Sequence, residues 1–243
     1  MRFARDVKMN HYIYASKTDP YHTSKWGELY PQSEIDQIQK LVKVGEETKC
    51  YYTWSVHISG FFTNLDTSNE TAYNERYQKL LAKFRQLYDA GVRKFDILND
   101  DFGQGTHEDV VNLLNKLTKE FIIPNNCKPI TYCMQGYNKA WSKEAELSAL
   151  KKLDKSIILY WTGDDVNSPI TQETIDYVSE KTGHKQSDIY ISNGKFTEYI
   201  PHFTYHGFRY VRVICDAPVK PEDFTAVAHA GQFWARDKEE KNI

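Results

Sequence analysis

Two adjacent carboxylates, Asp100 and Asp101, are the residues of this sequence whose types and spacing best suit acid–base chemistry. They follow residues 94–99 (KFDILN), which we predict to form a short strand. Side chains alternate between faces along a strand, but where the strand ends both can reach the same edge of a sheet. Neighbouring carboxylates disfavour being charged together, which leaves one proton donor and one charged acceptor near neutral pH.

The alternative for this pair is a turn or a helix cap, where aspartate is common, and the spacing alone does not separate the two interpretations. A second pair, Asp164 and Asp165, shows how little the dipeptide says by itself. For that pair we favour the turn.

The elements that must position these residues alternate along the chain between short strands rich in Tyr, Ile and Val and amphipathic helices. The expected strands are residues 11–16, 50–58, 94–99, 129–134, 156–161, 188–192 and 210–215, most of them apolar on both faces. The expected helices are residues 32–47, 71–90, 108–121, 142–153, 171–181 and 221–235, with Ser142 as an N-cap and Thr171 at a helix start.

Strands that alternate with helices in this way predict an α/β fold of parallel strands joined by crossover helices. Seven strands are one fewer than a TIM (β/α)8 barrel needs, and residues 1–8 have the pattern of a helix end. We therefore expect a barrel whose first strand precedes Met1. The alternative, an open doubly wound sheet, would be expected to carry a glycine-rich phosphate loop, and none follows any strand. Without a linker or low-complexity run, residues 1–243 are expected to form a single domain.

Composition excludes several classes of protein. The 243 residues are 40% hydrophobic and 26% charged, which is typical of a globular domain and not of a disordered or disulfide-dense chain. A net charge of −2 lacks the basic character of a nucleic-acid binder. The four cysteines have no zinc-type spacing, so we expect buried thiols, no metal and no cofactor; they are Cys50, Cys127, Cys133 and Cys215.

The chain offers no targeting signal. No apolar run approaches the roughly 20 residues that span a bilayer, and the first residues lack a signal-peptide core. We expect no membrane partner. The chain is either not exported or an internal piece of a longer protein, which in that case could be secreted or cell-surface.

In a barrel the active site lies at the carboxyl ends of the strands. The residues that follow the expected strands are mainly carboxylates, amides, tyrosines and histidines: Lys17, Asp19, Tyr21, His22, His57, Ser59, Asn99, Asp100, Asp101, Gln135, Tyr137, Asn138, Thr162, Asp164, Asp165, Asn193, Glu198, Tyr199 and Asp216. Such a set suits recognition of a polyhydroxylated ligand and acid–base chemistry.

Several segments resemble one family. Residues 12–22 (YIYASKTDPYH), followed by Lys25 and Trp26, resemble the YIYAPKDDPYH…KW segment of the family 84 glycoside hydrolases. These are β-N-acetylglucosaminidases that include O-GlcNAcase and bacterial hyaluronidase-type enzymes. Residues 95–101 (FDILNDD) resemble the family's catalytic strand, and 137–141 (YNKAW), 160–163 (YWTG) and Asn193 with 197–199 (TEY) resemble later segments in the family's order.

The resemblance implies a retaining β-N-acetylglucosaminidase in which the 2-acetamido oxygen of the substrate attacks the anomeric carbon and forms an oxazoline. Asp100 would orient and polarise the acetamido N–H, and Asp101 would be the general acid and then the base. The substrate would be a glycan or glycoprotein that contains N-acetylglucosamine. The remaining contacts would come from Lys17 and Asn193 to sugar hydroxyls, Tyr137 to the oxazoline region, Glu198 to the outer hydroxyls where the family has Asp, and Asp216 near a family Asn.

The sequence also departs from the family pattern. The family's first strand, with its Gly-Phe-Tyr-Gly segment, is absent, and the ISPG-like segment is only partly matched by residues 57–60 (HISG). Gly136 stands where the family has Glu, and Ile191 and Ser192 replace paired tryptophans. Two alternatives therefore stay open: a non-catalytic glycan-binding protein on a degenerate barrel, and a hydrolase of a different sugar.

Overall fold

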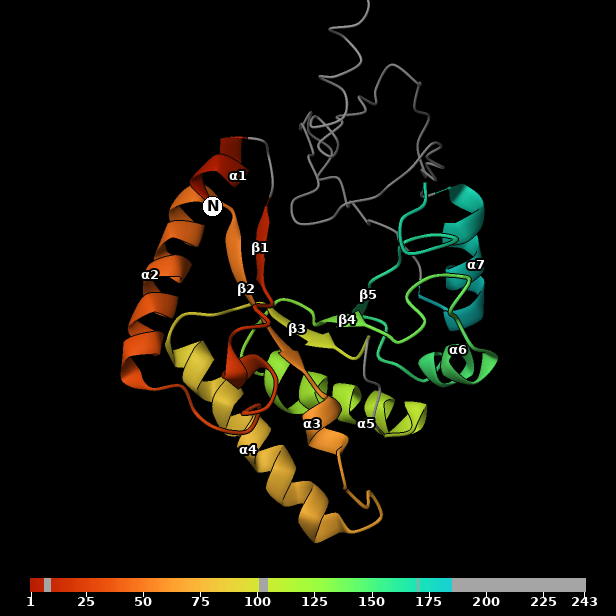
Figure 1. Ribbon diagram of the computed structural model, residues 1–243, viewed down its shortest axis with the longest axis horizontal. Helices are drawn as coiled ribbons and strands as arrows, with labels where there is room; N and C mark the ends of the chain where they lie inside the picture. Colours follow the sequence, from red (N-terminus) through yellow and green to blue (C-terminus); the bar gives the residue numbers. More distant parts are fainter. Residues whose placement is uncertain (7–9, 101–104, 170, 185–243) are drawn as a thin grey trace, which may run out of the picture.

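The computed structural model describes residues 1–6, 10–100, 105–169 and 171–184 (Figure 1). The strands expected at 188–192 and 210–215 and the helix expected at 221–235 lie outside these residues.

The described sheet has five strands, all parallel, in the order β1-β2-β3-β4-β5. Their bounds are β1 His11–Tyr14, β2 Tyr51–His57, β3 Phe95–Leu98, β4 Thr131–Cys133 and β5 Ile158–Leu159. Each strand pairs with the next one in the chain, as in a (β/α) barrel, and the order does not reverse as it does in a doubly wound sheet. The prediction of an α/β fold with parallel strands is confirmed.

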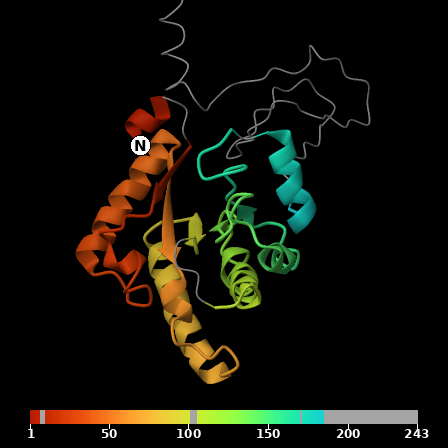
Figure 2. The same cartoon turned by 45° about the vertical axis from the view of Figure 1, so that its right-hand side comes forward.

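Helices connect the strands and lie along the outer side of the sheet (Figures 1 and 2). Their bounds are α1 Arg2–Asp6, α2 Gln32–Thr48, α3 Ser59–Phe62, α4 Glu70–Asp89, α5 His107–Leu117, α6 Glu144–Leu150 and α7 Gln172–Thr182. A 3-10 turn, η1, spans Pro20–His22, and a π-helical turn, η2, extends α5 over Thr118–Ile122. In the part of the chain that the structure describes, none of the helices has the length and apolar character required to cross a membrane.

Local signals placed some helix ends correctly and others wrongly. Thr171 begins α7 through a capping box with Thr174, as expected. Ser142 is not an N-cap: α6 begins at Glu144, and the Ser142 hydroxyl donates to the carbonyl of Lys139 instead. The fifth strand keeps only two of the six expected residues.

An aromatic core joins the sheet to the helices behind it. Trp54, Phe84, Phe95 and Phe121 are fully or almost fully buried, and the rings of Phe84 and Phe95 stack at 4.6 Å. Burial of each such ring contributes roughly 1.5–3 kcal/mol to stability. This cluster therefore fixes β2 and β3, whose ends carry the candidate site, against α4 and the end of α5.

The opposite face of β3 carries a buried carboxylate, so β3 is not among the expected strands that are apolar on both faces. Asp96 is fully buried and accepts a hydrogen bond of 2.9 Å from the hydroxyl of Tyr160. Lys94 lies 4.0 Å from Asp96 and donates to Thr131 and to the carbonyl of Pro129. Burial lowers the pKa of Lys94 to about 8 and raises the pKa of Asp96. The buried carboxylate thus has the Tyr160 hydroxyl on Oδ2 and the Lys94 ammonium group near Oδ1, which is how the interior tolerates its charge.

The cysteines are free thiols where the structure describes them. Cys50 is buried, and Cys127 and Cys133 are half-buried. Cys215 lies outside the described residues.

Candidate active site

Asp100 lies at the carboxyl end of β3, beside the last residue of β2. The register of the two strands pairs His57 with Leu98, so the His57 ring and the Asp100 carboxylate extend from neighbouring strand ends. The distance from His57 Nε2 to Asp100 Oδ1 is 3.7 Å. The Asp100 side chain keeps 29% of its surface exposed, so its carboxylate can reach a ligand as well as the protein.

Tyr137 lies in the loop after β4, which is hydrogen-bonded to the loop after β5. The amide of Thr162 donates to the carbonyl of Tyr137 at 2.9 Å, and the amides of Lys139 and Ala140 donate to residues 163 and 164 at 2.9 and 3.0 Å. The Tyr137 and Trp141 rings meet edge to face at 5.3 Å.

The second Asp pair lies in the loop after β5. Asp165 accepts a hydrogen bond from the amide of Val166 in a tight turn, in agreement with the turn expected for this pair.

A buried glutamate that sequence reasoning missed holds the start of the same loop. Glu146 of α6 is 2% exposed, and its two carboxylate oxygens accept the amides of Gln135 and Gly136 at 3.0 and 2.9 Å. A Cβ at Gly136 would lie 2.6 Å from the Cα of Ser142 and 2.9 Å from Glu146 Oε2. The packing therefore leaves no room for the glutamate that the family has at this position. The sequence feature that could have revealed Glu146 is its place on the same face of α6 as the buried residues Ala149 and Leu150.

The loop after β1 is anchored at several points. Two of its candidate site residues, Asp19 and His22, hold the loop in place through hydrogen bonds within the protein. Asp19 accepts the hydroxyl of Tyr30 at 2.6 Å and the amide of Tyr21 at 2.8 Å. His22 is buried, with Nδ1 2.7 Å from the carbonyl oxygen of Ser55. Lys17, by contrast, is exposed and accessible to a ligand.

Lys83 of α4 is a second anchor that the sequence analysis did not single out. Its ammonium group is fully buried, donates to the carbonyls of Tyr21 and Lys25 at 2.8 Å each, and lies over the rings of Tyr21, Tyr30 and Trp54. A lysine among the apolar positions of α4 was the signal that could have found it. Lys83 therefore connects the loop after β1, which carries Lys17, to α4 behind the sheet.

The ionisation of Lys83 gives a testable pH dependence. Burial lowers the pKa of Lys83 to about 7, whereas a lysine in the unfolded chain titrates near 10.4. Between these values the unfolded state binds more protons, so the contribution of Lys83 to stability rises with pH, by at most about 1.4 kcal/mol per pH unit. We expect Lys83→Met to reduce the slope of unfolding free energy against pH from 7 to 9.5, measured by urea denaturation. Lys79→Met, on the exposed face of the same helix, should keep the parental slope; equal slopes in all three proteins would contradict the assignment.

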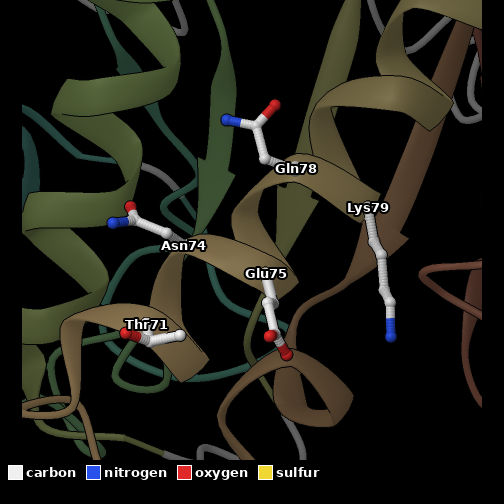
Figure 3. A pocket seen from close by; sticks show the side chains of 5 residues that line it. All are labelled: Thr71, Asn74, Glu75, Gln78 and Lys79. Atoms are coloured by element: carbon white, nitrogen blue, oxygen red, sulfur yellow. The ribbon is translucent and has the colours of Figure 1, made fainter.

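The pocket in Figure 3 is not part of this site. It is an open hollow on the outer face of α4, lined by Thr71, Asn74, Glu75, Gln78 and Lys79. These side chains are polar and exposed at helical spacing, opposite the buried stripe of the helix. A ligand there would bury little surface, so the hollow is a solvated helix face.

Four predicted site residues, Asp101, Asn193, Glu198 and Asp216, lie outside the described residues. The structure therefore brings together Asp100 and the His57 ring. It places Tyr137 in the loop after β4, the strand next to the one that carries Asp100, and leaves Lys17 exposed after β1. Their roles toward a substrate remain predictions.

Comparison with known proteins defines the class and then the family. The chain resembles the solved structure titled CpGH84D with a TM-score of 0.69 and 33% identity over 75% of this chain and 31% of that one. It resembles CpGH84B with a TM-score of 0.68 and 32% identity over 75% of this chain and 33% of that one. With the consecutive parallel strands, this places it in the TIM-barrel class of α/β proteins.

The family model described as beta-N-acetylglucosaminidase matches residues 1–193. The chain belongs to this family, family 84 of the glycoside hydrolases. It spans about a third of the length of the two solved structures. A second model, described as a bacterial alpha-L-rhamnosidase concanavalin-like domain, matches residues 165–229, most of which lie outside the described residues.

Proposed function

We propose that this chain carries the catalytic residues of a retaining β-N-acetylglucosaminidase that removes terminal N-acetylglucosamine by substrate-assisted catalysis. The observation that carries the proposal is the position of Asp100. It follows β3 by two residues at the carboxyl edge of the parallel sheet, partly exposed, in a chain whose family match spans residues 1–193. That edge is where barrel enzymes place their chemistry.

In the first step the acetamido oxygen attacks the anomeric carbon as the glycosidic bond breaks. Asp100 accepts the acetamido N–H and orients the group, which increases the negative charge on the attacking oxygen. Asp101 gives its proton to the leaving oxygen, and an oxazoline that still carries its proton on nitrogen (an oxazolinium ion) remains, hydrogen-bonded through that N–H to the Asp100 carboxylate. Because the nucleophile is tethered to the reacting centre, the step gains from proximity.

In the second step Asp101 takes a proton from water, and the water oxygen attacks the anomeric carbon and opens the oxazoline. Two displacements at the same carbon retain the β configuration. Asp101 thereby regains its proton, and Asp100 stays a hydrogen-bond acceptor throughout.

Other residues would hold the sugar. Tyr137 is fixed by the paired loops after β4 and β5 and would face the oxazoline region. Lys17 would bind a sugar hydroxyl from the anchored loop after β1, where its side chain is exposed. We assign Asn193, Glu198 and Asp216 to the hydroxyls on the grounds of the family resemblance. The substrate class is a glycan or glycoprotein ending in N-acetylglucosamine.

The test compares two substrates that differ in the nucleophile. Methylumbelliferyl β-N-acetylglucosaminide should be hydrolysed by the chain, and the matching β-glucoside should not, because it lacks the acetamido oxygen. Equal hydrolysis of both would indicate a different sugar hydrolase. Saccharide binding without hydrolysis of either, measured by calorimetry, would indicate a glycan-binding protein.

A further inference from the structure

We propose that His57 is a positioning residue that orients the Asp100 carboxylate toward the substrate's acetamido group. The inference rests on the proposed function for the role of Asp100. The contact itself is a property of the fold, and neither the mechanism nor the family resemblance given above assigns His57 a part in it.

The first step of the argument is that both groups are held by rigid backbone. β2 and β3 pair directly, and the amide of Ile58 donates to the carbonyl of Leu98 at 3.0 Å. On the other side of β3, the amide of Asn99 donates to the carbonyl of Cys133 at 2.9 Å. The His57 side chain is only 13% exposed. The ring therefore stays beside Asp100 without a mobile loop between them.

The second step concerns which ring nitrogen carries the proton. The amide of Ser59 donates to His57 Nδ1 at 3.4 Å, and the Ser59 hydroxyl lies 2.9 Å from the same nitrogen. Since a backbone amide can only donate, Nδ1 acts as the acceptor, and the proton of the neutral ring lies on Nε2. Nε2 is the atom that faces Asp100 Oδ1 at 3.7 Å.

The short helix α3, which begins at Ser59, is itself held in place by its neighbours. A Cβ at Gly60 would lie 2.4 Å from the Trp26 ring, so the loop after β1 packs directly on this turn. Arg76 of α4 donates to the carbonyls of Phe61 and Thr63 at 2.5 and 2.8 Å and holds the end of α3. The Ser59–His57 pair is thus built on packed elements from both sides.

The consequence for Asp100 is directional. When the Nε2–H closes on Oδ1, it takes up that carboxylate oxygen and limits rotation of the side chain, which leaves Oδ2 to accept the acetamido N–H. The distance of 3.7 Å is longer than a hydrogen bond, and such contacts commonly shorten when a substrate is bound.

The first test uses His57→Leu and His57→Gln. Leucine removes the donor, whereas glutamine can place an N–H near the position of Nε2. We expect His57→Leu to lower kcat on methylumbelliferyl β-N-acetylglucosaminide by roughly 10²-fold through misplacement of Asp100, with much of the loss restored in His57→Gln. The loss should be equal for leaving groups of different acidity, because proton donation belongs to Asp101. His11→Gln, at the amino end of β1, is the matched control and should keep parental kcat.

The second test needs no turnover. In protein labelled with ¹⁵N-histidine, the resonances absent from His57→Gln belong to His57. They should show the Nε2–H tautomer and should shift in Asp100→Asn. A parent without turnover that shows this coupling would defeat the proposed function and leave the contact standing. A parent with turnover whose His57→Leu variant matches it, an Nδ1–H tautomer, or a His57 resonance unmoved by Asp100→Asn would each overturn the positioning role.

Discussion

Replacing Asp101 by asparagine is expected to lower kcat on methylumbelliferyl β-N-acetylglucosaminide by roughly 10²–10⁴-fold, the range for loss of a general acid–base group. Asparagine has no acidic proton for the leaving oxygen and cannot accept one from water. The loss should therefore grow as the leaving group becomes less acidic. The measurement is kcat/KM across aryl N-acetylglucosaminides whose phenols span a range of acidity.

Asp100→Asn separates the two roles in the pair. Its carboxamide still offers an oxygen to the acetamido N–H but carries no negative charge, so the attack itself is weakened. We expect a loss that stays the same across the aryl series, in contrast to Asp101→Asn. Asp164→Asn is the control from the second Asp pair, whose carboxylate lies near Lys139 on the surface, and it should retain parental rates. Identical dependence on the leaving group in both variants would contradict the division of roles.

Glu146→Ala is expected to destabilise the protein by about 2–6 kcal/mol. The substitution leaves the amides of Gln135 and Gly136 without their acceptor in a buried place, at about 1–3 kcal/mol for each. Chemical denaturation with urea would measure the change. Glu144→Ala in the same helix removes only a surface pair with Lys181 and should change stability by less than about 1 kcal/mol.

The same variants test whether Glu146 serves the active site. If its role is to fix the loop that carries Tyr137, Glu146→Ala at a temperature where it is folded should raise KM, and Glu144→Ala should not. Gly136→Ala would disturb the same loop directly, because the added Cβ would clash with the backbone of Ser142. A Glu146→Ala protein as stable as Glu144→Ala would show that the buried carboxylate is dispensable.

Within the described residues, the sequence by itself determined the order and type of the five strands and of the longer helices between them, and the strand end after which Asp100 comes. Hydrophobic periodicity is a local property, so the strand at β3, the helix at α4 and the start of α7 at Thr171 could be predicted from neighbouring residues. Ser142 failed as a cap because its hydroxyl found another partner, the carbonyl of Lys139, in a loop whose path local rules do not set.

Only the tertiary structure decided which polar side chains face one another. Glu146 meets the amide of Gly136 across 10 positions, His57 meets Asp100 from the next strand, and Lys83 reaches a carbonyl 62 positions away. Each partnership depends on how strands pair and helices pack, and a buried charged group requires partners wherever the packing supplies them. The candidate site residues could therefore be proposed from their types and positions, whereas the side chains that anchor the loops around them depend on contacts between distant segments.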